Sequence, residues 1–177
     1  KKQQNTHRDL REDVYEFYRY GVYVMAGFIV GFDRDIEDIF ERQIEFIEQT
    51  HIHMAMTGVL QALPGTQLWR RLVQEDRLLD INENKGDAFA LFNFRPVMEP
   101  RKLVEGWLKI LEVLYAPTAV LERTYRMNGL VLPNGLRRDY PRAASVTSSL
   151  KVLLALLWKL GVRGHYRWDF WRYLLKV

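Results

Sequence analysis

The stretch VYVMAGFIVGF, residues 22–32, decides the fold class of this chain. Nearly every residue in it is apolar, and continuous apolar strands are typical of parallel sheets that are covered on both faces. A second apolar run of strand length follows at residues 53–60. Between the two runs, apolar residues recur at helical spacing from Ile36 to Ile47, which predicts a helix that Asp35 begins. The sequence therefore predicts a strand, a helix and a second, parallel strand.

Helices are expected on both sides of this unit. Thr6 begins one as a capping residue, and Gly21 stands where a C-terminal helix cap belongs. The turn Pro64-Gly65-Thr66 starts another helix. Residues 6–78 thus alternate helix, strand, helix, strand, helix, which is the signature of βαβ units. Because two strands do not make a stable sheet alone, we expect the chain to be the last portion of a larger α/β structure.

The character of the sequence changes near residue 80. Residues 80–94 are rich in Asn, Asp and Gly and indicate a connecting segment, so the predicted domains are residues 1–80 and 81–177. Helices dominate the second domain, and Pro117 interrupts one of them. The fold class is therefore α/β followed by mostly α. Helices are expected at residues 103–114, at 120–127, from Ser145 or Thr147 to Leu160 (stopping at Gly161) and at 165–175, with a loop over residues 130–142.

Composition excludes several classes of protein. Hydrophobic residues make up 48 % of the 177 residues and charged residues 27 %, which is ordinary for a globular protein. No uncharged apolar stretch reaches the length of a transmembrane helix. Cysteine is absent, which rules out disulfides, thiolate-held zinc and iron–sulfur ligation by this chain. His51 and His53 form a His-x-His pair without a third ligand in view, so no metal site is predicted.

The C-terminal tail is basic and aromatic. Residues 135–177 carry nine basic and two acidic side chains, whereas the whole chain has a net charge of +4. Such a tail favours an anionic partner. One interpretation is a helix that lies in a membrane interface. The other is that the aromatic side chains pack onto the helical domain and the arginines stay solvated. The aromatic residues concerned are Trp158, Tyr166, Trp168, Phe170, Trp171 and Tyr173.

Two motifs at a fixed interval carry a resemblance to a known family. The first is GFIVGFDRD, residues 27–35, and the second is LQALPGTQL, residues 60–68, followed by EDRL at 75–78. Together they resemble strands five and six of the barrel of radical S-adenosylmethionine (SAM) enzymes from the cobalamin-binding subgroup. Residues 93–96 and 115–123 resemble the C-terminal domain of unknown function in a subset that includes hopanoid C-methylases.

The resemblance implies which residues face SAM in the intact enzyme. These are Gly27, Ile29 and Gly31 of the first motif, Asp33 and Asp35 after it, and Gln61 at the end of the second strand. A close approach of a cofactor needs residues without side chains, and the two carboxylates can accept hydrogen bonds from ribose hydroxyls or an amino group.

Alternatives remain for these positions. The glycines are also consistent with close packing in a buried strand, Asp35 with a helix N-cap, and the Pro64 turn with a purely structural role. Relatives commonly carry Pro-Gly-Glu where Asp33-Arg34-Asp35 stands here, which puts the SAM contact of this segment in question.

The resemblance also implies an activity for the intact protein. That protein would be a radical SAM enzyme with a 4Fe-4S cluster and cobalamin. It would act as a methyltransferase on a lipid-like or other small substrate. It would lie in the cytoplasm, with peripheral membrane contact through the tail. The cluster and cobalamin would be held by the N-terminal remainder of the polypeptide, so this chain alone is predicted to be inactive and to carry no catalytic residue. The alternative function is a basic helical module that docks on a membrane or a partner subunit. Nucleic acid is not expected as a partner, because the tail is helical and nucleic-acid-modifying relatives carry a small β-barrel.

Overall fold

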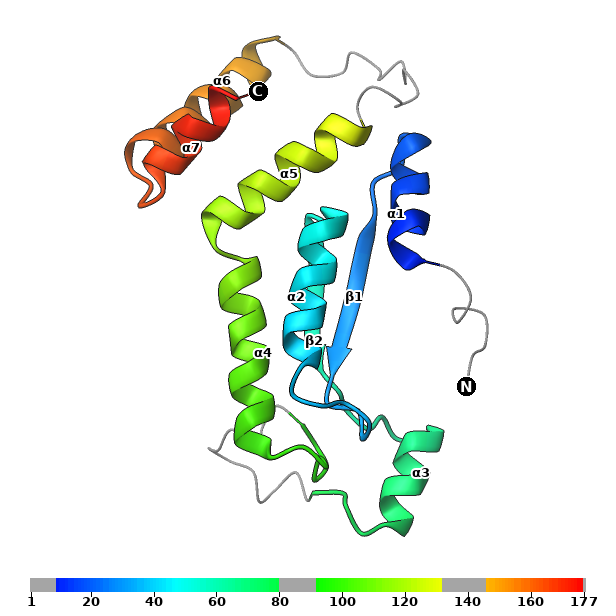
Figure 1. Ribbon diagram of the computed structural model, residues 1–177. Coiled ribbons are helices and arrows are strands. Elements are labelled where there is room, and N and C mark those ends of the chain that lie inside the picture. The colour runs from blue at the N-terminus through cyan, green and yellow to red at the C-terminus, as the bar shows by residue number, and fades with distance from the viewer. Residues whose placement is uncertain (1–8, 80–91, 132–145, 177) are drawn as a thin grey trace. The chain divides into compact units, whose positions relative to one another are not determined.

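The computed structural model describes residues 9–79, 92–131 and 146–176, with side chains from Leu150 onward in the last segment. Its elements confirm the predicted alternation of helices and strands up to α3 (Figure 1). In chain order they are α1 (Leu10–Arg19), β1 (Met25–Val30), α2 (Ile39–Thr50), β2 (Met54–Val59), α3 (Gln67–Gln74), α4 (Pro100–Leu114), α5 (Pro117–Val131), α6 (Val146–Leu156), the π-helix η3 (Leu157–Val162) and α7 (Arg167–Leu174).

The chain forms two compact units. The sheet unit comprises residues 25–49 and 54–114, and the helical unit comprises residues 1–24, 50–53 and 115–177. The predicted domain boundary near residue 80 lies outside the described residues, and the division into residues 1–80 and 81–177 stays a prediction.

The sheet unit is built on one parallel strand pair. Strands β1 and β2 align from Met25 opposite Met54 to Val30 opposite Val59, which confirms the predicted parallel pairing. The two strands are the whole sheet among the described residues. The intervening helix α2 makes the right-sized connection, since parallel strands need a crossover of a dozen or more residues.

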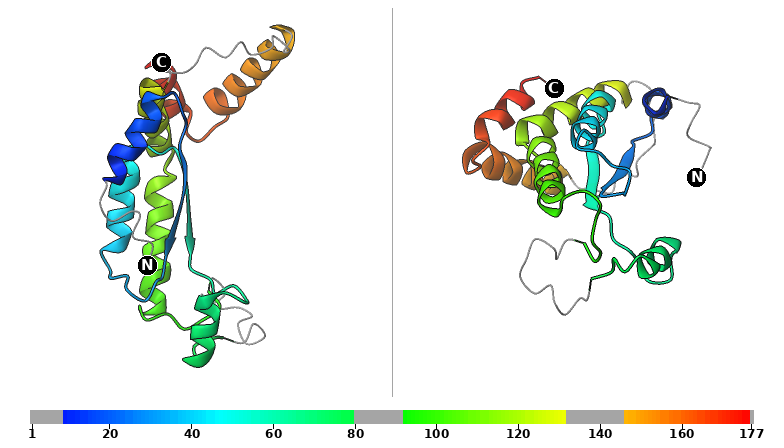
Figure 2. Two further views of the ribbon diagram at one scale, coloured as in Figure 1. Left: turned by 90° about the vertical axis from the view of Figure 1, so that its right-hand side faces the viewer. Right: turned by 60° about the horizontal axis from the view of Figure 1, so that its bottom comes forward.

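Helices cover one face of this sheet, whereas the sequence predicted coverage of both faces (Figure 2). On the covered face, the Phe28 ring meets the Phe46 ring of α2 edge-on at 6.0 Å, and Trp107 Nε1 of α4 donates to the Thr57 carbonyl at 3.4 Å. Burial alternates along β1, with Val30 buried and Ile29 half exposed. The described residues supply no element that packs on the other face, although its side chains are as apolar as those beneath the helices.

Helices α2 and α4 lie in close contact. Gly106 of α4 faces the Phe40 ring, and a Cβ atom at this position would overlap that ring. At the exposed margin of the contact, Lys109 Nζ lies 2.5 Å from Glu41 Oε1. Glycine is therefore needed at position 106 for close approach, in spite of its low helix propensity.

Several predicted helix ends are confirmed. Gly21 follows α1 with φ of 71°, and the Val22 N–H donates to the Phe17 carbonyl across the turn. This is the left-handed C-terminal cap that favours glycine. Thr66 caps α3 by accepting from the Trp69 N–H at 3.2 Å. Pro117 separates α4 from α5, as expected for a residue that cannot continue a helix.

Other boundaries were predicted wrongly. The N-cap of α1 is Asp9, which accepts from the Arg11 N–H at 2.9 Å, whereas Thr6 lies outside the described residues. Helix α2 begins at Ile39, so Asp35 does not cap it. The backbone also runs through Gly161 as a π-helix instead of stopping there. Gly161 serves packing: a Cβ atom there would lie 2.9 Å from the Trp171 ring.

The helical unit has a small core of its own. Tyr18 of α1 and Met127 and Val131 of α5 are buried against one another. Helix α5 ends at Val131 and therefore includes residue 130, where the sequence predicted the start of a loop. The Tyr18 hydroxyl donates to the Thr50 carbonyl at 3.0 Å. Burial is the main cause that raises the pKa of Tyr18 to about 12, and the neighbouring Tyr15 is the smaller one. Among the described residues, no helix combines the length and the hydrophobicity needed to cross a membrane.

Candidate functional site

The candidate site lies at the carboxyl end of the two strands. The chain leaves β2 alongside the end of β1, because the Leu60 N–H donates to the Val30 carbonyl at 2.8 Å. The Asn93 side chain then clamps the buried Ala62 backbone. Its Oδ1 accepts from the Ala62 N–H at 2.8 Å, and its Nδ2 donates to the Ala62 carbonyl at 2.7 Å. A side-chain amide thus takes the place of a third strand's backbone at this edge.

The turn after β1 is held by Asp35. Its Oδ2 accepts from the Gly31 N–H at 2.8 Å and from the Phe32 N–H at 2.9 Å. Gly31 has φ of 103°, and a Cβ atom there would lie 3.3 Å from Leu103 Cδ2 of α4. Glycine is therefore required at position 31 by backbone conformation and by packing, independently of any cofactor.

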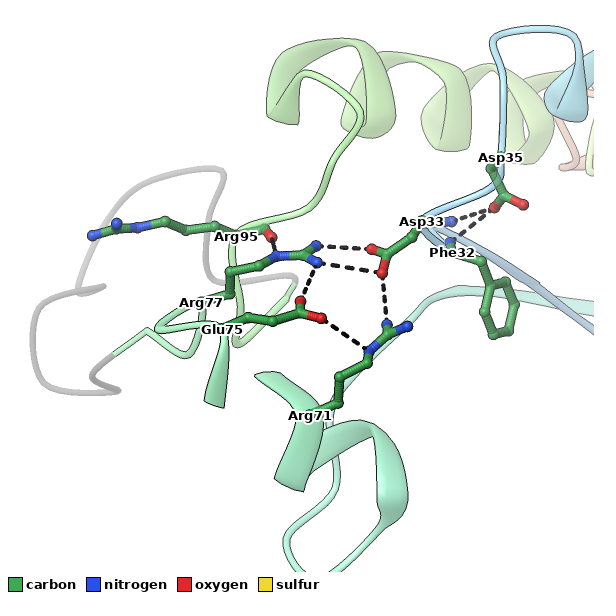
Figure 3. A network of polar contacts seen from close by, with 8 residues as sticks. Phe32, Asp33, Asp35, Arg71, Glu75, Arg77 and Arg95 are labelled. Carbon is green, nitrogen blue, oxygen red and sulfur yellow. Dashed lines mark hydrogen bonds and ion pairs between the residues drawn. The ribbon is translucent and has the colours of Figure 1, made fainter. Parts of the chain in front are cut away.

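Asp33 forms the centre of an ionic cluster (Figure 3). Its Oδ2 accepts from Arg71 Nη2 at 2.6 Å, and its two oxygens accept from the Arg77 guanidinium at 2.8 and 3.3 Å. The hydrogen bond from Arg77 is the main reason why the pKa of the Asp33 carboxyl is lowered from its ordinary value. Asp33 is three-quarters buried, so these bonds link the β1 turn to α3 and to the strand-like segment after it.

Arg77 connects the remaining parts of the cluster. Its Nη1 donates to Glu75 Oε2 at 2.8 Å, and its Nε donates to the Arg95 carbonyl at 2.9 Å. The guanidinium also stands 5.9 Å from the centre of the Phe94 ring. Arg77 therefore uses its planar fork to hold three separate segments in register, which a lysine could not do.

The exposed face of the sheet carries a gap in its side chains. A Cβ atom at Gly27 or at Gly58 would meet no atom within 4 Å among the described residues. Gly27 pairs with Met56, and Gly58 pairs with Ile29. Each glycine therefore has an exposed apolar side chain directly across the strand pair, and the two open positions lie diagonally to one another. Met25, Ile29, Met54 and Met56 of this face are 43–58 % exposed. The result is an exposed apolar surface with open space above Gly27 and Gly58.

The six predicted site residues lie in three places. Gly31, Asp33 and Asp35 come together in the turn after β1, whereas Gly27 and Ile29 lie on the exposed sheet face. Gln61 lies past the end of β2 and is exposed. The SAM contacts of all six positions stay predictions.

Sequence reasoning missed the residues that organise this edge. Arg71, Arg77 and Asn93 were not singled out, although Arg77 belongs to the EDRL motif and Asn93 begins the segment 93–96 that carries part of the resemblance. The two histidines belong to the helical unit, where His51 and His53 meet the rings of Tyr15 and Tyr23. In the part of the chain that the structure describes, no three His, Asp or Glu side chains form a metal site.

Residues 66–177 match a family described as a domain of unknown function, DUF4070. The chain belongs to this family. An uncharacterized methyltransferase from Synechocystis sp. is 33 % identical over 182 residues, which cover all of this chain and 33 % of the relative. The hopanoid C-2 methylase of Rhodopseudomonas palustris is 31 % identical over 169 residues, which cover 93 % of this chain and 31 % of the relative.

A more distant relative has a different named substrate. The bacteriochlorophyllide d C-12(1)-methyltransferase of Chlorobaculum tepidum is 27 % identical over 111 residues, which cover 62 % of this chain and 24 % of the relative. The chain spans about a third of the length of the Synechocystis and Rhodopseudomonas relatives. No solved structure matches it. These findings confirm the predicted resemblance to hopanoid C-methylases and show that the relatives are named as methyltransferases.

Proposed function

We propose that the chain is the C-terminal portion of a cobalamin-dependent radical SAM methyltransferase. In this proposal it supplies the last two strands of the barrel, part of the SAM pocket and a helical cap over a lipid-like or other small substrate. The family membership and the named activities of the relatives support the reaction class. The observation that carries the proposal is the exposed apolar face of the β1–β2 sheet.

That face has the properties of the inside of an incomplete barrel. In a βα barrel, helices cover the outside of a parallel sheet and the other face turns towards the interior. Here α2 and α4 cover one face, whereas the face that carries Gly27 and Ile29 is exposed. A two-stranded parallel sheet is not stable alone. Further strands from the same polypeptide would pair with the free edges and close the interior over this face.

The exposed face is suited to a flat apolar group such as the adenine ring of SAM. Gly27 leaves room for close approach, and Ile29 offers an apolar contact beside it. The turn that Gly31 and Asp35 form fixes where the polar edge of the pocket would lie. SAM and a four-iron cluster supply radical chemistry when bound, and cobalamin supplies the methyl group. Because this chain has no cysteine, the cluster would be held by the rest of the polypeptide.

Binding of SAM to the longest expressed form of the protein tests this proposal. After anaerobic reconstitution with iron and sulfide, we expect the visible absorbance of sulfur-to-iron charge transfer, which reports an assembled cluster. We also expect stoichiometric binding of SAM by calorimetry. Gly27→Val, which fills the gap on the exposed face, is expected to weaken SAM binding at least about tenfold, since one lost close contact amounts to ~1.4 kcal/mol or more.

Gly129→Val is the matched control, because a Cβ atom at Gly129 of α5 also meets nothing within 4 Å but lies in the helical unit. This control is expected to bind SAM like the parent protein. The proposal fails if the reconstituted protein binds neither iron nor SAM, or if Gly27→Val binds SAM unchanged while its circular dichroism is also unchanged.

A further inference from the structure

Helix α6 exposes apolar side chains around its circumference. Every described residue from Leu150 to Leu156 is exposed, so no side of this segment is covered by the rest of the described chain. Single exposed apolar residues are normal on a protein, but a continuous group of them marks an interaction site. The large apolar side chains and their exposed fractions are Leu150 53 %, Val152 59 %, Leu153 50 %, Leu154 57 % and Leu156 46 %.

The same surface continues through η3 into the turn before α7. Trp158 is 60 % exposed and Val162 is 50 % exposed, and Trp168 at the start of α7 is 72 % exposed. We call this set, from Leu150 to Trp168, the α6–α7 surface. A hairpin contact fixes its shape, since Trp171 Nε1 donates to the Gly161 carbonyl at 2.9 Å.

Positive charge is arranged along this surface. Lys151 and Lys159 are both exposed and are eight residues apart, a spacing that places them within one broad face of a helix. Arg163 follows at the turn, and Arg167 lies over the Trp168 ring at 5.8 Å. Asp169 is the only acid among residues 150–176. None of the first three cations forms an ion pair with a described residue.

The opposite side of α7 has partners in its own unit. Lys176 Nζ lies 3.0 Å from Glu122 Oε2 of α5, and the Tyr173 ring meets the Tyr125 ring edge-on at 6.4 Å. These contacts attach α7 to α5 and leave the α6–α7 surface uncovered by the described residues. The hairpin is therefore anchored on one side and open on the other.

We propose that the α6–α7 surface docks on an anionic lipid bilayer and lies in its interface. Interfacial segments combine exposed leucines and tryptophans with lysines and arginines, whose long side chains extend to the headgroups, and the α6–α7 surface exposes the same combination. Residues 146–162 span roughly 25 Å at 1.5 Å per residue, which is less than the hydrocarbon core. The near absence of acids means that the positive charge of this surface complements an anionic headgroup layer. The inference stands on the helical unit alone and does not depend on the proposed reaction.

Flotation with lipid vesicles tests the inference on the longest expressed form of the protein. Vesicles of phosphatidylcholine that contain about 30 mol % phosphatidylglycerol are compared with vesicles of pure phosphatidylcholine. We expect binding to the anionic vesicles that weakens as salt is raised. Lys151→Gln with Lys159→Gln is expected to weaken binding roughly 25-fold, since each cation near an anionic surface contributes about fivefold.

Lys102→Gln with Lys109→Gln is the matched control, because it removes two exposed lysines of α4 and the same charge. This control is expected to lose less than about twofold, an effect of net charge alone. A blue shift of tryptophan fluorescence on anionic vesicles, reduced in Trp158→Phe, would place the α6–α7 surface at the lipid.

Three results would overturn the proposal. One is the absence of binding to anionic vesicles, and another is equal weakening by the two lysine pairs. The third is protection of Trp158 from acrylamide quenching before lipid is added, which would show that a second copy or another part of the polypeptide covers the surface. The SAM measurement above is unaffected by any of these results, so the failure of one inference is distinguishable from the failure of the other.

Discussion

The Asp33–Arg77 ion pair provides a quantitative test of how the carboxyl edge of the sheet is held. Two hydrogen bonds, at 2.8 and 3.3 Å, join these side chains, which are 24 % and 19 % exposed. Exposed pairs contribute up to about 1 kcal/mol, and hydrogen bonds to charged groups contribute ~1.5–3 kcal/mol. At this intermediate burial we expect a coupling free energy of about 1–2 kcal/mol between the two side chains.

Hydrogen exchange is the suitable assay, because it reports local opening of one edge in a chain that has two units. The reporters are the Arg95 N–H, which donates to the Arg77 carbonyl at 2.7 Å, and the Leu79 N–H. Asp33→Asn and Arg77→Met should each accelerate exchange at these amides. If the two side chains act independently, the acceleration of exchange in the double variant equals the product of the two single accelerations. We expect it to be smaller than that product by about 5- to 30-fold, which corresponds to the expected coupling at ~1.4 kcal/mol per decade.

The exposed pair Lys109 and Glu41 is the control for this cycle. Its side chains are 54 % and 57 % exposed, so its coupling should stay below about 0.5 kcal/mol. If the Asp33–Arg77 coupling is no larger than that of Lys109–Glu41, the cluster is a surface contact and does not hold the edge.

Three other perturbations probe the same edge. Because the pKa of Asp33 is lowered by folding, its stabilisation is present above the ordinary value of 3.8 and is lost as pH falls through the folded value; Asp33→Asn should therefore flatten the acid limb of an unfolding curve measured by circular dichroism. Gly31→Ala, forced into positive φ and against Leu103, should destabilise the sheet unit by about 1–3 kcal/mol in thermal unfolding. Asn93→Ala leaves the buried Ala62 backbone unpaired and should accelerate exchange of the Ala62 N–H about tenfold or more.

Local patterns predicted the order of elements but not their exposure. The apolar runs at residues 22–32 and 53–60 identified both strands, and Gly21 and Thr66 identified helix ends, because each of these signals acts within a few residues. Coverage of the sheet depends on segments distant in the chain. Ile29 is as apolar as the buried Val30, and nothing in the residue type tells which of them a helix will cover.

The candidate site was predictable only in part for the same reason. The Gly31 turn follows from a motif of adjacent residues, whereas Asp33 meets Arg77 across 44 positions and Asn93 meets Ala62 across 31. A single sequence carries no spacing rule for such contacts. Asp35 shows the opposite error, because an acid before an apolar helix satisfies the rule for an N-cap, yet its carboxylate caps the turn behind it.

These contacts give a physical reason for the departure from the Pro-Gly-Glu pattern of the resembling enzymes. A proline would rigidify the turn by fixing its own φ angle. Here the chain carries Asp33, whose bonds to Arg71 and Arg77 tie the turn to neighbouring segments, and Asp35, whose short side chain reaches the turn's own N–H groups. Both carboxylates are thus engaged in holding the backbone. We infer that side-chain interactions replace backbone restriction as the source of rigidity at this turn.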